Sequence, residues 1–304
     1  MVLGLSGGID STVTLGLCVM ALGPGRVFGV LMPEHSVDEE SELFGAMAAK
    51  HFGIEYTTES ITPALEALGY YRRYNDAVQK VVPQYGNGWK SKIITSDTLF
   101  SGGYTYFYLV VKDPSGGTQK IRLAKVPYLE ILAATNFKQR TRMMIEYYHA
   151  DRLHYAVVGT PNRLEYELGF FVKQGDGSAD LKPIAHLYKS QVFQLADYLG
   201  VPPPIRERIP TTGTYSLEQG QDEFFFSLPC DKMDLCLYAR NNGSSTEQVA
   251  SATGLTIDQV ERVFADIDSK RSNTRYLHLA PILVKEIWGG PTESKRRAET
   301  KDEY

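Results

Sequence analysis

A short run near the N-terminus combines two glycines with two hydroxyl residues and an acid. In order, the run is Ser6, Gly7, Gly8, Ile9, Asp10 and Ser11. An apolar stretch, residues 2–5, precedes it, and an apolar stretch typical of a buried helix, residues 12–22, follows it. A glycine loop between a strand and a helix brings backbone N–H groups onto an anion, and the N-terminus of the helix adds positive potential. The run matches neither the Walker loop nor the Gly-x-Gly-x-x-Gly fingerprint, which argues against Walker-type hydrolysis and hydride transfer.

This loop resembles the pyrophosphate-binding loop of the N-type ATP pyrophosphatases, which cleave ATP between its α and β phosphates. NAD, GMP, argininosuccinate and asparagine synthetases and tRNA thiolation enzymes belong to that group. The resemblance implies an ATP-binding loop made of Ser6, Gly7, Gly8, Asp10 and Ser11. It also implies that Asp10 holds Mg²⁺ on the phosphates, since a carboxylate oxygen suits a hard cation.

A second block, residues 159–189, narrows the resemblance to one family. It contains Gly-Thr-x-Asn-Arg-x-Glu from Gly159, Lys-x-Gly-Asp-Gly-x-x-Asp-x-x-Pro-Ile from Lys173, and Leu-Tyr-Lys from Leu187. Together these motifs are far more specific than a glycine loop, and they resemble those of the NAD synthetases. The resemblance implies a ligase that uses ATP and Mg²⁺ to form an amide.

Several polar residues of this block are candidates for the ATP site. Glu165 is placed to complete a magnesium site with Asp10, and Thr160 is a candidate contact to the nucleotide. Lys173 and Lys189 are cations suited to phosphate or to charge that develops on the leaving pyrophosphate. We expect Lys189 to bind ATP and Lys173 to bind the second substrate.

Further candidates for the second substrate come from two segments. Asp176 and Asp180 lie in a glycine-rich turn, where they are expected to accept ribose hydroxyls or to hold the substrate ring. Asn136 and Arg140 match the family motif Asn-x-x-x-Arg-x-Arg-Met, in which we expect Asn136 to cap a helix. In the family this arginine faces the nucleotides. The catalytic residues implied are therefore Asp10, Lys189 and Arg140.

Two later segments also resemble the family. Residues 210–212 and 221–223 match a segment in which a hydroxyl meets the ATP phosphates and an Asp-Glu pair ends a mobile loop, so Thr211 and Thr212 are predicted to bind ATP. Arg275 falls where relatives place a lysine that closes over the reaction centre. An arginine in place of this lysine keeps the positive charge but changes the geometry, because guanidinium and ammonium are not interchangeable.

Composition limits the class of protein. The 304 residues are 43% hydrophobic and 22% charged, with a net charge of −4, as expected for a globular protein without a general nucleic-acid or membrane-binding surface. No apolar run reaches the roughly 18 residues of a membrane span. The three cysteines are too few and too scattered for a disulfide framework, which favours the cytoplasm.

The elements that must position these residues alternate at the start of the chain. Strands are predicted at 2–5, 26–32 and 55–58, with helices at 12–22 and 38–52 between them. This β-α-β-α-β order predicts an α/β fold, a doubly wound parallel sheet with Rossmann-like three-layer architecture, in which ligands bind at the carboxyl ends of the strands. The glycine loop lies at such an end.

The rest of the chain keeps this pattern after an interruption. A Tyr-rich segment, about 70–125, is predicted to be an inserted β-hairpin. The elements expected after it are helices at 128–149 and 188–199, a strand at 155–158, and helices at 246–253 and 257–268. We expect one NAD synthetase-like domain, residues 1–285, and a polar tail, 286–304. The last two helices lack the basic face of a DNA-binding helix-turn-helix.

The resemblance implies a specific reaction. In NAD synthetases the nicotinate carboxylate of deamido-NAD attacks the α-phosphate of ATP, and ammonia then displaces AMP from the acyl-adenylate. The sequence begins one residue before the first strand, so we expect ammonia to be free or to come from a separate glutaminase. A homodimer is implied, although the sequence does not contain the preceding helix that contributes to it in relatives.

Three other functions remain open from the sequence. An amide ligase for a different carboxylic acid fits the Tyr-rich insert and Pro161, which replaces the family's usual glycine. A tRNA thiolase fits less well, because Cys18 lies in an apolar helix and no basic surface is indicated. A non-catalytic ATP-binding protein would be favoured if Asp10 and Glu165 did not hold Mg²⁺.

Overall fold

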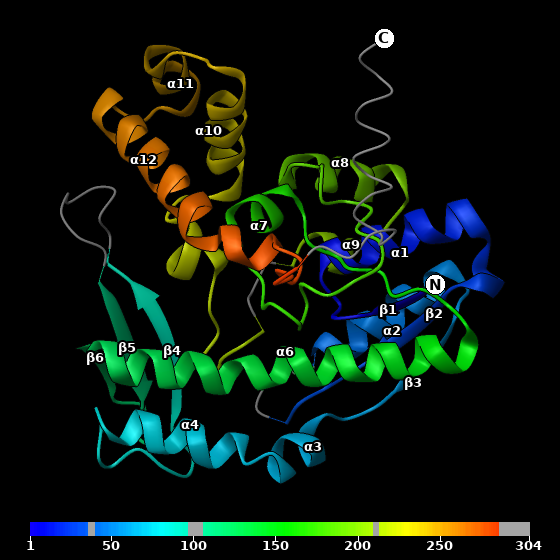
Figure 1. The fold of residues 1–304 in the computed structure, drawn as a ribbon, viewed down its shortest axis with the longest axis horizontal. Helices are drawn as coiled ribbons and strands as arrows, with labels where there is room; N and C mark the ends of the chain where they lie inside the picture. Colours follow the sequence, from blue (N-terminus) through cyan, green and yellow to red (C-terminus); the bar gives the residue numbers. More distant parts are fainter. Residues whose placement is uncertain (36–39, 97–105, 209–212, 286–304) are drawn as a thin grey trace.

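A parallel sheet of three short strands forms the N-terminal part of the protein (Figure 1). The computed structural model describes four stretches of the chain, residues 1–35, 40–96, 106–208 and 213–285. The strands, in spatial order, are β1 (Val2–Gly4), β2 (Phe28–Leu31) and β3 (Glu55–Thr58). Parallel bridges from Val2 to Val157 and from Val158 to Leu181 continue the pairing beyond β1. The predicted strand at 155–158 is therefore present only as bridges.

Both faces of β1 and β2 are buried, which explains why these two strands are apolar throughout, whereas the edge strand β3 is polar and partly exposed. Val2 and Val30 contribute to one core cluster, whereas their neighbours Leu3 and Leu31 contribute to another on the opposite face. Helices on the first face are α3 (Thr62–Ala67), α4 (Tyr70–Gln79) and α6 (Lys125–Leu153). Those on the second are α1 (Ile9–Leu22), α2 (Glu40–Phe52) and α8 (Lys189–Tyr198). The predicted three-layer α/β fold is confirmed.

Helix α6 is 29 residues long and runs past both sheets (Figure 1). It begins at Lys125, before the predicted start at 128. The prediction that Asn136 caps a helix is wrong, because Asn136 lies in the interior of α6. The helix extends towards its N-terminus because Ile131 and Ala134 bury an apolar face against the core. Pro127 is tolerated there, since the N–H that proline lacks has no intrahelical partner in the first turn.

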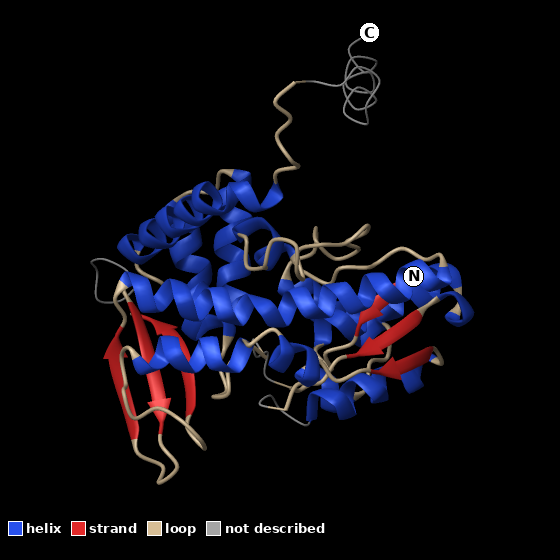
Figure 2. Ribbon diagram, turned by 60° about the horizontal axis from the view of Figure 1, so that its bottom comes forward, coloured by secondary structure: helices blue, strands red, loops and turns tan. Residues whose placement is uncertain are grey.

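A second, antiparallel sheet lies at the opposite end of the molecule from the first (Figure 2). Its strands, in spatial order, are β4 (Lys90–Thr95), β5 (Phe107–Lys112) and β6 (Thr118–Arg122). The predicted hairpin is confirmed in β5 and β6, and β4 adds a third strand. The Tyr-rich start of this region is helical instead, because Tyr70, Tyr74, Ala77 and Val78 repeat at helical spacing and are buried.

The start of β4 and the turn between β5 and β6 touch each other. Gly88 has φ 75°, and a Cβ atom added to it would come within 3.2 Å of Cγ of Pro114. Asp113 holds the turn by accepting hydrogen bonds from the backbone N–H groups of Ser115, at 2.8 Å, and Gly117, at 3.0 Å. Contacts within residues 88–117 therefore hold this end of the sheet together.

A third core cluster joins the helices of the C-terminal part. Its main helices are α7 (Arg163–Leu168), α10 (Cys230–Asn242), α11 (Thr246–Thr253) and α12 (Ile257–Thr274). The remaining short elements are η1 (Pro24–Arg26), α9 (Pro203–Arg206), the π-helix η2 (Asp222–Phe226) and η3 (Arg275–His278). Ser245 and Thr256 open α11 and α12 with capping boxes. Among the described residues, no helix is long and apolar enough to cross a membrane.

Candidate active site

A cavity of about 790 Å³ opens at the carboxyl ends of β1 and β2. Leu5, which follows β1, and Met32, which follows β2, line it together with residues of α6, α7 and α12. This is the position in which doubly wound sheets bind ligands. The cavity is large enough for a nucleotide and part of a second substrate.

The glycine loop forms one end of the cavity. Gly8 is the N-cap of α1, and its carbonyl accepts hydrogen bonds from the hydroxyls of Ser11 and Thr12, at 2.9 Å each. Ser6, Gly8, Asp10 and Ser11 line the cavity as predicted. Gly7 acts differently: it has φ 74°, and an added Cβ would lie 2.6 Å from the carbonyl oxygen of Ser41. Gly7 therefore lets the loop turn against α2, while the first turn of α1 faces the cavity.

Asp10 joins the glycine loop to the second sequence block. One of its carboxylate oxygens, Oδ2, forms an ion pair with the ammonium of Lys189, and the other accepts a hydrogen bond from Nδ2 of Asn162 at 3.2 Å. The Lys189 side chain is only 1% exposed. Burial lowers the pKa of Lys189, but the charges of Asp10 and Glu165 outweigh it and leave the pKa raised. A cation is thus fixed beside the phosphate-binding loop.

Glu165 completes this charged centre. Its Oε2 accepts the N–H of Asn162 at 3.1 Å in a capping box, and its Oε1 accepts a hydrogen bond from Nε2 of Gln221 at 2.8 Å. Burial and the nearby charge of Asp10 raise the pKa of Glu165 to about 7, against a smaller opposing effect of Lys189. A carboxylate whose pKa is raised beside a second carboxylate suits a divalent cation, which would take the place of the proton on Glu165.

The donor set at Asp10 and Glu165 fits Mg²⁺. Both residues offer carboxylate oxygens, the ligands that Mg²⁺ prefers. Across the described residues, no group of three or more His, Cys, Asp or Glu is placed to hold a metal. Water and substrate phosphates would therefore supply the remaining ligands, as is usual for Mg²⁺ bound with a nucleotide.

A second polar group on α6 lines the same cavity and was not predicted from the sequence. Nε of Arg142 donates to the carbonyl of Met32 at 3.4 Å, and Glu146 follows one turn later. Burial raises the pKa of Glu146 to about 8. The protein around Asp176 also reduces its hydration and raises its pKa to about 6, although the Asp176 side chain is accessible from the cavity that it lines. The spacing of Gln139, Arg142 and Glu146 along one helical face is the signal that would have found them.

Glu146 is expected to make the stability of the protein depend on pH. Its pKa in the folded protein, about 8, lies above the ordinary value of 4.5, so the folded state keeps a proton that the unfolded chain releases. The stabilisation is complete below about pH 4.5 and is lost progressively as the pH rises towards 8. The free energy of unfolding, measured in urea between pH 5 and 8, should therefore fall less steeply for Glu146→Gln than for the wild type. Equal slopes would contradict this.

The other predicted residues divide into two groups. Thr160, Asn136 and Asp176 line the cavity. Within the described part of the chain, the residues Arg140, Lys173 and Asp180 do not. Thr211 and Thr212 lie outside the described residues.

The three predicted residues outside the cavity have partners of their own. Arg140 is exposed and donates from Nη2 to the carbonyl of Lys173 at 3.3 Å. Nζ of Lys173 donates to the carbonyl of Tyr276 at 2.8 Å, and Asp180 accepts the N–H of Val157 at 2.8 Å. The structure thus brings Arg140 and Lys173 together, but on the surface.

Near the C-terminal end of α12, the cation on the cavity is not the predicted one. Arg275 is exposed at the end of the helix, whereas Lys270 lines the cavity. Nζ of Lys270 contacts the carboxylate of Asp266 and the carbonyl of Phe225, at 2.5 Å each. Lys270 precedes Arg275 by five residues, which places the two on different parts of the helical surface.

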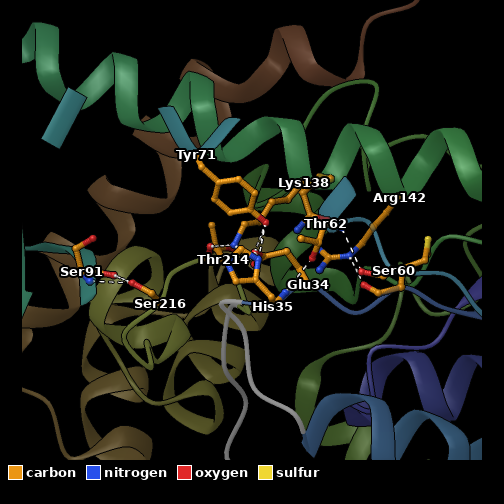
Figure 3. Close-up of polar contacts among 12 residues, drawn as sticks. Glu34, His35, Ser60, Thr62, Tyr71, Ser91, Lys138, Arg142, Thr214 and Ser216 are labelled. Carbon is orange, nitrogen blue, oxygen red and sulfur yellow. Dashed lines mark hydrogen bonds and ion pairs between the residues drawn. The ribbon is translucent and has the colours of Figure 1, made fainter. Parts of the chain in front are cut away.

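A buried ion pair joins α6 to the loop that follows β2, in the wall of the cavity (Figure 3). Nζ of Lys138 is 2.6 Å from Oε2 of Glu34, and the two side chains are 1% and 0% exposed. Tyr71 on α4 donates its hydroxyl to Oε1 of Glu34 at 2.7 Å, and Lys138 also donates to the carbonyl of Thr214 at 3.0 Å. Glu34 and Thr214 line the cavity. The pair therefore ties one wall of the cavity to both helices.

Comparisons with known proteins identify the family of the chain. The NAD synthase family model matches residues 1–87 and 116–275. An NH(3)-dependent NAD(+) synthetase of Rhizobium meliloti is 57% identical over 287 residues, which cover 94% of this chain and 86% of that protein. One of Thermotoga maritima is 37% identical over 214 residues, 69% of each chain.

Solved structures agree in fold. The NMN synthetase of Francisella tularensis has a TM-score of 0.61 at 22% identity, over 94% of this chain and 89% of that one. The NH3-dependent NAD synthetase of Campylobacter jejuni has a TM-score of 0.57 at 22% identity, over 93% and 88%. Since the family model covers most of the sequence and close relatives span nearly all of it, the chain belongs to the NAD synthase family.

Proposed function

We propose that the protein is an ammonia-dependent NAD synthetase. It adenylates the nicotinate carboxylate of deamido-NAD with ATP, releases pyrophosphate, and lets ammonia displace AMP to form the amide of NAD. The observation that carries this proposal is the buried centre of Asp10, Glu165 and Lys189 at the N-terminus of α1. Relatives more than half identical to this chain bear the name of that enzyme.

The chain's own groups account for the handling of ATP. N–H groups in the first turn of α1 bind the phosphates, and Ser6 and Ser11 add hydroxyls at the same end of the cavity. Lys189 neutralises charge that develops on the leaving pyrophosphate. Asp10 and Glu165 would hold Mg²⁺, which when bound shields the phosphate charge and makes phosphorus more open to attack.

The second substrate needs alignment more than a protein nucleophile. Its carboxylate attacks the α-phosphate directly, so the protein contributes orientation and exclusion of water. Asn136, Thr160 and Asp176 are proposed to contact the substrates inside the cavity. Phe107 and Tyr128, which stack with ring centroids 4.1 Å apart, form an apolar part of the same wall.

We further propose a homodimer that packs along α6. The exposed face of this helix carries large apolar side chains, namely Val126 (60% exposed), Leu129 (49%), Met144 (53%) and Tyr148 (61%). Such a stripe on a monomer is typical of an interface. The surface residues Arg140 and Lys173 lie on or beside this helix, so a second copy would enclose them. With Asp180 they are proposed to reach the substrate in that assembly, and Thr211 and Thr212 to reach ATP.

Ammonia is proposed to arrive free or from a separate glutaminase. We place the enzyme in the cytoplasm, a proposal supported by its three unpaired cysteines.

Pyrophosphate release tests the proposed function. The purified protein is supplied with MgATP and ammonium, and deamido-NAD is compared with a panel of small carboxylic acids. Pyrophosphate and NAD in equal amounts with deamido-NAD are the expected result. Release with another acid alone would move the substrate while keeping the chemistry, and release with none would favour an ATP-binding protein without turnover.

A further inference from the structure

One wall of the cavity is formed by residues 213–227, and this segment is held by the antiparallel sheet. Gly213, Gln221 and Phe224 of the segment line the cavity. Among the described residues, strand β4 pairs with another strand, β5, along one edge only. Its other edge faces residues 216–223, and the π-helix η2 also packs on it. The segment therefore covers an edge that would otherwise present unpaired backbone groups.

Ser91 is the buried anchor of this contact (Figure 3). Its N–H donates to Oγ of Ser216 at 2.9 Å, and its carbonyl accepts the N–H of Leu217 at 3.2 Å. The hydroxyls of Tyr74 and Tyr85 each lie 2.8 Å from its Oγ. Because Ser91 is fully buried, loss of these partners would leave polar groups without water.

Two more contacts follow along β4. Gln219, which is 2% exposed, donates its amide to the carbonyl of Ile93. Lys92 forms an ion pair with Glu223, whose backbone carbonyl accepts the hydroxyl of Thr95 at 3.2 Å. The segment is thus attached on both sides of residue 221.

The residue between these attachments reaches the charged centre. Gln221 is 8% exposed and donates to Oε1 of Glu165 at 2.8 Å. Its position is set by its neighbours Gln219 and Glu223, which are both bound to β4. The family model leaves residues 88–115 unmatched, so β4, which makes these contacts, and its neighbour β5 are additions to the common fold.

We propose that the sheet of β4, β5 and β6 is a brace that positions Gln221, and through it Glu165, in the ATP site. Ser91 and Lys92 are its positioning residues. The inference rests on the proposed function, since it assigns Glu165 to ATP binding. With the brace weakened, only part of the molecules hold the segment in place, and ATP binds that fraction. The KM for ATP should therefore rise, while kcat at saturating ATP changes little.

Reversal of the Lys92 and Glu223 charges tests the brace without opening the core. The variants are Lys92→Glu, Glu223→Lys and the double variant that restores an opposite pair. Lys80→Glu is the matched control, because Lys80 pairs on the surface with Glu130 of α6 at 2.6 Å, and neither residue belongs to the segment. Amide hydrogen exchange of residues 216–227 is measured with the steady-state constants, and the unfolding midpoint confirms that each variant is folded.

Each single reversal should speed exchange in 216–227 and raise the KM for ATP by about fivefold, since it replaces attraction by repulsion. The double variant should return both within about twofold, and the control should change neither. Unchanged exchange and KM in the single variants, or no recovery in the double variant, would overturn the brace. If the wild type made no NAD, the proposed function would fail, but the exchange data would still decide whether β4 holds the segment.

Discussion

The Asp10→Asn variant is expected to lose about a thousandfold in kcat/KM for ATP while remaining folded. Asparagine has almost the same shape, so one oxygen remains for Lys189 or Asn162, the present partners of Asp10. The negative charge is lost, however, and with it a ligand for Mg²⁺ and the counter-charge that holds Lys189. Pyrophosphate release at saturating deamido-NAD and ammonium measures the effect.

A matched control is available outside the cavity. Asp268 pairs with Arg240 at 2.6 Å between α10 and α12 and does not line the cavity. Asp268→Asn should therefore keep full activity. If Asp10→Asn retained more than about a tenth of the activity, Asp10 would not be a ligand that the reaction needs.

The Lys138→Met variant is expected to lose about 3–5 kcal/mol of unfolding free energy. Methionine fills most of the space, but Glu34, whose side chain is 0% exposed, loses a cation that lies 2.6 Å from its carboxylate. Thr214 also loses the ammonium that its carbonyl accepts. Equilibrium unfolding in urea measures the loss.

Two further variants separate the ion pair from packing. The double variant Glu34→Gln with Lys138→Met removes the buried charge as well, and it should be more stable than Lys138→Met alone. Lys80→Met breaks an ion pair whose lysine side chain is 51% exposed, and it should change stability little. A double variant as unstable as the single one would show that shape, and not charge, decides this site.

The parallel sheet and its glycine loop were predictable because their signals are local. β1 is buried on both faces, and the loop needs only Gly7 with positive φ and Gly8 before α1. The pairing of Asp10 with Lys189 was different: 179 residues separate them, and no local pattern relates the two. Motifs of a known family placed both residues in one site, and the structure supplies the geometry.

The errors of prediction have physical causes. Asn136 is a good capping residue, but the apolar turn before it is buried and is also helical, so α6 begins at Lys125. Tertiary packing therefore outweighs the capping preference of Asn136. Arg140 and Arg142 are both in the motif, yet a helix turns about 200° between them, so Arg142 lines the cavity and Arg140 is exposed. The role of Gln221 depends on β4, which pairs across 125 or more residues and has no counterpart in the family model.

The contact between Gly88 and Pro114 shows how residues can be inserted into such a chain, or deleted from it, during evolution. The family model stops at residue 87 and resumes at 116, and these two points lie next to each other in space. A direct peptide link between them would shorten the chain without pulling apart α4 or α6. Of the contacts that α4 and the following loop make with residues 88–115, the hydrogen bonds of Tyr74 and Tyr85 to Ser91 would be lost. Residues 88–115 are therefore a unit that one deletion in the coding sequence can remove, and one insertion can restore, without cutting into α4 or α6.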